Sequence, residues 1–152
     1  MTSSSVLFIC TGNYYRSRFA EEFFRHRARE LRLPWITDSR GLRIGHPGNV
    51  GPISRHARLG LQSLGIAFDE DRYPRPLLES DLERATRTIA VDRSEHEPMI
   101  AQSFPTWLSR IEFWDVEDID RARPDDALAR LGGSIEGLLA QLIGVTEPRP
   151  RA

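Results

Sequence analysis

The segment that follows the first apolar run of the chain carries the residues best suited to chemistry. It reads Cys10-Thr-Gly-Asn-Tyr-Tyr-Arg16-Ser17, leaves a predicted buried strand and enters a predicted helix. In such a segment successive backbone N–H groups can surround an anion at the helix N-terminus. Gly12 and Asn13 are residue types that adopt the left-handed conformations a tight loop needs. We therefore expect a phosphate-binding loop whose substrate contacts come from Thr11, Gly12, Asn13, Tyr14, Tyr15 and Ser17.

Cys10 and Arg16 are the two residues of this loop that predict catalysis. The N–H dipoles and the guanidinium of Arg16 favour the thiolate form of Cys10. A bound phosphoryl group would then meet Cys10 as nucleophile and Arg16 as a bidentate clamp on its oxygens. Ser17 could donate a hydrogen bond to the sulfur. The alternative is that Cys10 is a buried apolar residue ending a strand, as lone cysteines usually are.

The elements that must position this loop alternate along the chain. Apolar runs predict strands at 6–10, 35–37, 88–91 and 111–114. Amphipathic spacing predicts helices at 17–31, 54–64, 80–85, 94–102 and 125–143, the last one interrupted at Gly132-Gly133. This alternation predicts an α/β fold, a four-stranded parallel sheet with helices on both faces and the phosphate-binding loop between the first strand and the first helix.

Polar residues gather where such a fold places its ligand. In open parallel sheets ligands bind at the carboxyl ends of the strands. The second strand is expected to close at Asp38-Ser39, followed by a glycine-rich loop over 41–52. The predicted strand ends therefore carry Cys10, Asp38, Ser39, Asp92 and Asp115.

Composition excludes several function classes. The 152 residues fit one domain over 1–152, with a Pro- and charge-rich tail at 146–152 that we expect to fray. The net charge of −1 argues against a nucleic-acid binder, and no apolar run is long enough for a membrane span. All 21 basic residues are arginine, which excludes lysine-dependent chemistry. The single cysteine excludes an internal disulfide and a multi-cysteine zinc site, and indicates a reducing, cytoplasmic compartment.

Neither a metal nor another cofactor is expected. The histidines lack the spacing of metal ligands, and we expect them in surface or helix-capping positions; those considered are His46, His56 and His96.

The first residues resemble a known family. The stretch from Val6 to Glu21 is similar to the signature of low-molecular-weight protein tyrosine phosphatases and the related arsenate reductases. Weaker similarity continues at 38–42, 49–54, 64–66 and 89–92, so that the resemblance spans most of the chain. It implies a four-stranded parallel sheet and a two-step reaction through phosphocysteine.

The resemblance also implies roles for single residues. The nucleophile of the family falls on Cys10 and its phosphate-binding arginine on Arg16. Its loop-shaping asparagine falls on Asn13, its thiolate-bonding serine on Ser17, and the serine that steadies the asparagine on Ser39.

A phosphatase of this kind needs an acid that protonates the leaving oxygen and then a base that activates water. The family carries an Asp-Pro after its fourth strand. Asp118 is the best match to the aspartate of this Asp-Pro, judged by its distance from Trp114 along the chain, although Ile119 stands in place of the proline. Asp115, which ends the predicted strand, is the rival. Either carboxylate could instead solvate the loop or cap the next helix.

Departures from the family affect the expected substrate. Tyr15 stands where many members carry a second cysteine, and the family's tyrosine pair has no match at 119–121. Because Cys10 is alone, the cysteine relay of the arsenate reductases cannot operate. Tyr14 stands where the related phosphoarginine phosphatases carry threonine, which disfavours phosphoarginine as the substrate. Both tyrosines could wall the pocket or pack into the fold.

Together these patterns predict a cysteine-dependent phosphomonoesterase that acts through phosphocysteine, with a protein-tyrosine phosphatase as the favoured form. Its partner would be a phosphorylated protein or a small aryl phosphate. The alternative is a catalytically weak phosphate-binding or phosphoprotein-binding regulatory module. A phosphocysteine carrier is disfavoured, because carriers with a similar sheet lack an arginine at the position of Arg16.

Overall fold

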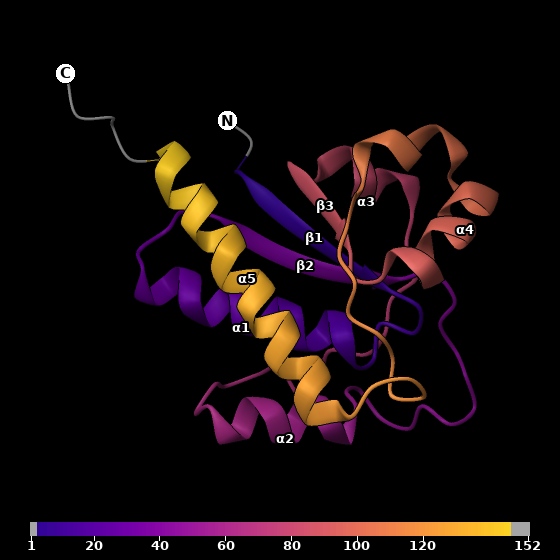
Figure 1. Ribbon diagram of the computed structural model, residues 1–152, viewed down its shortest axis with the longest axis horizontal. Helices are drawn as coiled ribbons and strands as arrows, with labels where there is room; N and C mark the ends of the chain where they lie inside the picture. Colours follow the sequence, from indigo (N-terminus) through magenta and orange to yellow (C-terminus); the bar gives the residue numbers. More distant parts are fainter. Residues whose placement is uncertain (1–2, 147–152) are drawn as a thin grey trace.

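The computed structural model describes residues 3–146 and has the predicted α/β architecture (Figure 1). Four parallel strands form one sheet in the order β2-β1-β3-β4. The strands are β1 (Ser5–Cys10), β2 (Ile36–Gly41), β3 (Arg87–Ala90) and β4 (Glu112–Phe113). The helices are α1 (Arg16–Glu30), α2 (Arg55–Ser63), α3 (Glu79–Arg84), α4 (Arg93–Ser103), a 3₁₀ helix η1 (Pro105–Arg110) and α5 (Pro124–Thr146). The tail from 147 onward, which the sequence predicts to fray, lies outside the described residues.

Strand β1 is central and buried on both faces, as its unbroken apolar run predicts. Its side chains alternate between two apolar clusters. Val6, Phe8 and Cys10 belong to one cluster, and Leu7 and Ile9 belong to the other. The side chain of Cys10 is therefore directed to a defined side of the sheet.

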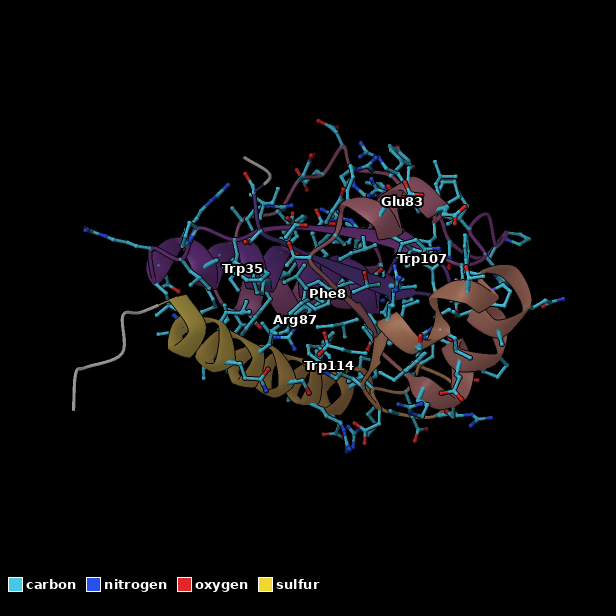
Figure 2. The ribbon with its side chains drawn as sticks, turned by 90° about the horizontal axis from the view of Figure 1, so that it is seen from above. Phe8, Trp35, Glu83, Arg87, Trp107 and Trp114 are labelled. Atoms are coloured by element: carbon cyan, nitrogen blue, oxygen red, sulfur yellow. The ribbon has the colours of Figure 1, made fainter. Side chains whose placement is uncertain are left out.

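That side is covered by α1, α2 and α5, which lie together in Figure 1. Phe8 packs there against Phe24 of α1 and against Trp114, with ring centroids 6.0 and 5.8 Å apart. Figure 2 places Phe8 in the middle of the molecule, with Trp114 on its α5 side. This packing fixes the start of α1, and with it the loop that precedes α1.

The other side is covered by α3, α4 and η1. Leu7 and Ile9 pack there with Leu82 of α3 and Ile100 of α4. Because helices cover both sides of an all-parallel sheet, the predicted fold class is confirmed.

The second strand is longer than predicted, because polar residues do not end it. It runs from Ile36 to Gly41 and includes Asp38, Ser39 and Arg40. The last two are buried, and each finds a polar partner. The Ser39 hydroxyl donates to Glu21 at 2.5 Å, and Arg40 lies 3.2 Å from Asp81. Buried polar groups with partners are compatible with an interior strand.

The predicted interruption of the last helix is wrong. Helix α5 passes through Gly132 and Gly133 without a break. Gly132 lies against α1, where an added Cβ would be 3.6 Å from the ring of Phe23. Two glycines lower helix propensity by only about 1 kcal/mol each, which packing against α1 and α2 outweighs. In the described part of the chain, no helix is both long and apolar enough to cross a membrane.

Candidate active site

The loop between β1 and α1 leaves its N–H groups available to an anion. Its carbonyl groups at Cys10, Thr11 and Tyr14 accept hydrogen bonds from the segment after β2, at 3.0, 2.8 and 2.8 Å. Within residues 3–146, no protein group accepts from the backbone N–H groups of 12–18. A run of free N–H donors at the start of a 15-residue helix forms an anion cradle.

Gly41 at the end of β2 allows this loop to pack closely. A Cβ at this position would lie 2.9 Å from the carbonyl oxygen of Thr11 and 3.0 Å from the Cβ of Asn13. Only glycine fits that approach, so β2 supports the cradle from behind.

Cys10 lies at the floor of the cradle. It is buried, yet it also lines the cavity in front of the loop. Its Sγ is 2.9 Å from the Oγ of Ser17. Because Ser17 Oγ already accepts from Asn13 Nδ2 at 2.8 Å, its own hydrogen is available for the sulfur. The hydrogen bond predicted between Ser17 and Cys10 is therefore present.

Asn13 holds the loop from within. It is fully buried and has a left-handed backbone with φ of 50°, as the sequence predicts. Its Nδ2 also donates to Ser39 Oγ at 2.8 Å. Its Oδ1 accepts from Arg72 Nη1 and from the backbone N–H of Arg75, both at 3.0 Å. Ser39 therefore contacts Asn13 as the family resemblance implies.

Arg72 is a buried residue behind the cradle that the sequence did not single out. Its Nη2 donates to the carbonyl of Ser39 at 2.6 Å and lies 3.7 Å from Glu21. Burial lowers the pKa of Arg72, although the charge of Glu21 opposes the shift. Arg72 thus completes a chain of hydrogen bonds through Asn13 and Ser17 to the sulfur of Cys10. Its position in an irregular loop gave no periodic signal.

Arg16 is almost fully buried beside the cysteine and is surrounded by acceptors. Its Nη1 donates to the carbonyl of Val116 at 2.9 Å, and its Nη2 donates to Glu95 at 2.7 Å. Carboxylate oxygens of Asp118 and Asp92 lie 3.4 and 4.0 Å away. Burial alone would lower the pKa of Arg16, but the charges of Cys10, Asp118 and Glu95 outweigh it and raise that pKa. The guanidinium is therefore held permanently charged at the cradle.

Glu95 was also missed by sequence reasoning. Its Oε2 accepts from Arg16 and from the hydroxyl of Thr11, and it lies 3.0 Å from His96 Nε2. Burial would raise the pKa of Glu95, but the hydrogen bonds from His96, Arg16 and Thr11 lower it well below its usual range. The available signal was the position of Glu95 in the first turn of a helix that follows the predicted strand end at Asp92.

Of the two positions expected for His96, surface or helix cap, the surface position is wrong because the side chain is fully buried. Its Nδ1 accepts from the backbone N–H of Asp92, the N-cap of α4, at 3.2 Å. In the neutral ring Nε2 then carries the hydrogen, facing Glu95 and, at 3.1 Å, Thr11. His96 links the start of α4 to the first residue of the loop.

The cradle opens into a cavity of about 740 Å³, a size typical of ligand sites. Cys10 and Arg16 lie at its floor, and Asp118 and Ile119 line one wall. Another wall comes from the segment after β2 and from the start of α2, with Arg43, Ile44, Gly45, His46, Gly48, Asn49, Ser54, Arg55 and His56.

Both tyrosines of the loop border this cavity, in different environments. The Tyr14 hydroxyl donates to the carbonyl of Val50 at 2.6 Å, which fixes the half-buried ring against the wall. Tyr15 is buried in the core, with its ring centroid 6.0 Å from that of His56. Burial, followed by the charge of Asp118, raises the pKa of Tyr15 to about 12. Tyr14 therefore presents more of its surface to a ligand.

The geometry separates the two candidate acids. Asp118 lines the cavity, and its Oδ1 accepts from the N–H of Ile119 at 2.8 Å. Asp115 is exposed and does not line it; its Oδ2 pairs with Arg130 at 2.5 Å. Among residues 3–146, no group of three or more His, Cys, Asp and Glu side chains is arranged to hold a metal ion.

The parallel sheet and the cysteine-containing anion loop at its carboxyl edge define an α/β phosphatase. The family model of the low molecular weight phosphotyrosine protein phosphatases matches residues 5–143, and the chain belongs to this family of hydrolases.

Individual relatives differ in substrate. The chain is 28% identical over 131 residues to a protein-arginine-phosphatase of Bacillus subtilis, covering 86% of this chain and 82% of the relative. It is 28% identical to the crystal structure of a low molecular weight protein tyrosine phosphatase from T. tengcongensis, with a TM-score of 0.78 and coverage of 91% and 99%. It is 26% identical to YfkJ from Bacillus subtilis, with a TM-score of 0.83 and coverage of 97% and 99%.

Proposed function

We propose that the protein is a cysteine-dependent phosphomonoesterase that acts through a phosphocysteine intermediate. The observation that carries this proposal is the position of Cys10 Sγ, 2.9 Å from Ser17 Oγ at the floor of a loop with free N–H donors. Arg16 and Asp118 border the same cavity. A thiol, a charged guanidinium and an anion cradle that share one small space support a nucleophilic role for Cys10.

In the first step the thiolate of Cys10 attacks phosphorus, and the bond from phosphorus to the ester oxygen breaks. Protonated Asp118 gives its proton to the leaving oxygen. Arg16 and the loop N–H groups hold the phosphoryl oxygens and the charge that develops on them. In the second step Asp118 accepts a proton from water, the water oxygen attacks phosphorus, and the P–S bond breaks to release phosphate and the thiolate.

For the substrate, we propose phosphotyrosine in proteins rather than phosphoarginine. The fixed ring of Tyr14 supplies an aromatic surface above the cradle that can stack on an aryl ester. It also stands at the position where the family resemblance implies a threonine in phosphoarginine phosphatases. The similarity to a protein-arginine-phosphatase makes phosphoarginine the competing substrate to be measured.

A phosphate-binding regulatory module is the second candidate. The observation that favours it is the hydrogen bond from Arg16 Nη2 to Glu95 Oε2 at 2.7 Å. The Glu95 carboxylate would compete with a phosphoryl group for the guanidinium of Arg16. Efficient hydrolysis of an aryl phosphate by the wild-type protein would exclude this candidate.

The test is hydrolysis of an aryl phosphate by the purified protein and by Cys10→Ser. We expect turnover in the wild type, and none in Cys10→Ser, with phosphate binding retained. Turnover by Cys10→Ser at the wild-type rate would refute the mechanism. Initial rates on a phosphotyrosyl peptide and on a phosphoarginyl peptide of the same sequence then decide the substrate.

The acid is tested with Asp118→Asn and Asp115→Asn. We expect Asp118→Asn to slow phosphoryl transfer from a poor leaving group by about 10²–10⁴-fold, with a much smaller effect on a good one. Asp115→Asn, exposed and outside the cavity, serves as the matched control. The reverse pattern would assign the acid to Asp115. We also propose a reducing, cytoplasmic compartment, where the lone thiol would stay reduced.

A further inference from the structure

One wall of the cavity is formed by an unusual stretch of the chain. From Leu42 to Phe68 the sequence contains no Asp or Glu, although the whole chain has 22. The same stretch contributes two arginines and two histidines to the cavity lining, Arg43, His46, Arg55 and His56.

The two arginines of this wall are not neutralised. Both are exposed, and neither has a carboxylate within salt-bridge distance among residues 3–146. Arg43 Nη2 only reaches the amide oxygen of Gln102, at 3.3 Å. Many other arginines, such as Arg27 and Arg40, are paired with carboxylates.

These arginines are held at a fixed position relative to the cysteine. The backbone N–H of Arg43 donates to the carbonyl of Thr11 in the cradle at 2.8 Å. Arg55 begins α2 directly after the N-cap Ser54, whose own N–H donates to the carbonyl of Tyr14 at 2.8 Å. The positive charges therefore stand beside the cradle rather than on a distant surface.

Another part of the cavity lining carries negative charge. Asp118 lines the cavity, and the neighbouring Glu117 and Asp120 are exposed in the same loop. Arg43 and Arg55 therefore place positive charge, and Asp118 places negative charge, on different parts of the same lining. A bound substrate can therefore meet positive charge from one part of the lining and negative charge from another.

We infer that the wall formed by Arg43 and Arg55 is a subsite for acidic side chains, so that the substrates are phosphoproteins with Asp or Glu on one flank of the phosphorylated residue. This inference rests on the proposed phosphatase function and adds the class of protein sequence that it acts on. The 117–120 loop confines the preference to one flank, because acidic residues on the other flank are repelled.

The experiment compares kcat/KM for four phosphotyrosyl peptides that differ only in two flanking positions on each side: neutral on both sides, acidic before the phosphotyrosine, acidic after it, and acidic on both sides. We expect one of the two single-flank peptides to exceed the neutral peptide by about two- to tenfold, as for one or two solvent-exposed ion pairs. The advantage should shrink in 0.5 M salt because exposed charges are screened.

The double variant Arg43→Gln/Arg55→Gln should bring the ratio of acidic to neutral kcat/KM close to one. Arg29→Gln is the matched control, because Arg29 is exposed near the far end of α1 and has no carboxylate partner among the described residues. It should leave the ratio as in the wild type. Equal rates on all peptides, a preference for basic flanks, or an acidic preference that persists in the double variant would each overturn the inference. Failure of the phosphatase proposal is distinguishable, since then a small aryl phosphate monoester that has no flanking residues would also resist hydrolysis.

Discussion

Replacement of Glu95 by glutamine removes one negative charge beside Arg16 and leaves the shape of the side chain almost unchanged. In the wild type Oε2 of Glu95 accepts from Arg16 and Thr11 and faces His96. The variant tests whether this carboxylate is a structural part of the site. We expect it to lower the free energy of unfolding near neutral pH and to lose that effect in acid.

The contacts of Glu95 set the size of the effect. A hydrogen bond to a charged group contributes about 1.5–3 kcal/mol, and the neutral amide retains part of each bond. Arg16 keeps the carbonyl of Val116 and the nearby carboxylate of Asp118. The loss therefore stays below the roughly 3–5 kcal/mol of an orphaned buried charge. We expect about 2 kcal/mol at pH 7, or about 4–8 °C in Tm for a chain of this length.

The pH dependence follows from the lowered pKa of Glu95 in the folded protein. In the unfolded chain a glutamate has a pKa of about 4.3. The stabilisation is therefore fully present above about pH 5 and is lost as the pH falls toward the lower pKa of the folded state. At pH 3 protonation of the unfolded chain removes about 1.8 kcal/mol, so that wild type and Glu95→Gln should then differ little.

The assay is denaturant unfolding of the wild type and Glu95→Gln from pH 7 to pH 3, followed by circular dichroism. Glu97→Gln is the control, because Glu97 lies on the same helix, is partly exposed and pairs with Arg93 on the helix surface. It should change stability by less than about 0.5 kcal/mol at any pH. Equal stability of Glu95→Gln and wild type at pH 7, or a difference that persists undiminished at pH 3, would refute the reasoning.

Three further changes test other parts of the structure. Asn13→Ala should lower the free energy of unfolding by about 2–4 kcal/mol and slow aryl phosphate hydrolysis, because it removes all four side-chain hydrogen bonds and places Ala in a left-handed backbone. Asn13→Gly relieves only the backbone strain, so it should recover a minor part of the lost stability. Gly60→Ala should cost about 1–3 kcal/mol with kcat little changed, since its Cβ would meet Leu128 at 2.7 Å, and a fully stable variant would contradict this packing. Ultraviolet titration should show one phenol that ionises only near pH 12, and Tyr15→Phe should lack that step; an unchanged titration would place the buried phenol elsewhere.

The fold and the floor of the site could be predicted because they depend on local patterns. The apolar run from Val6 to Cys10 predicts a doubly buried strand, and the amphipathic helix after it fixes the position of the loop. The residue types of that loop are dictated by local backbone demands, as the left-handed Asn13 illustrates. Such requirements are met within a few residues, so they are visible in the sequence.

The distant partners of Arg16 and Asn13 could not be predicted in the same way. Glu95 lies 79 positions from Arg16 in the chain, and Arg72 lies 59 positions from Asn13. The position of Glu95 in a first helical turn was a weak signal, and the irregular loop that carries Arg72 gave none. Asp38 and Ser39 were expected to end a strand, yet β2 continues through them to Gly41. Ser39 finds a buried partner on α1, and the following Arg40 finds one on α3. Only the folded chain brings these groups together, since a polar side chain becomes compatible with burial once a distant partner satisfies it.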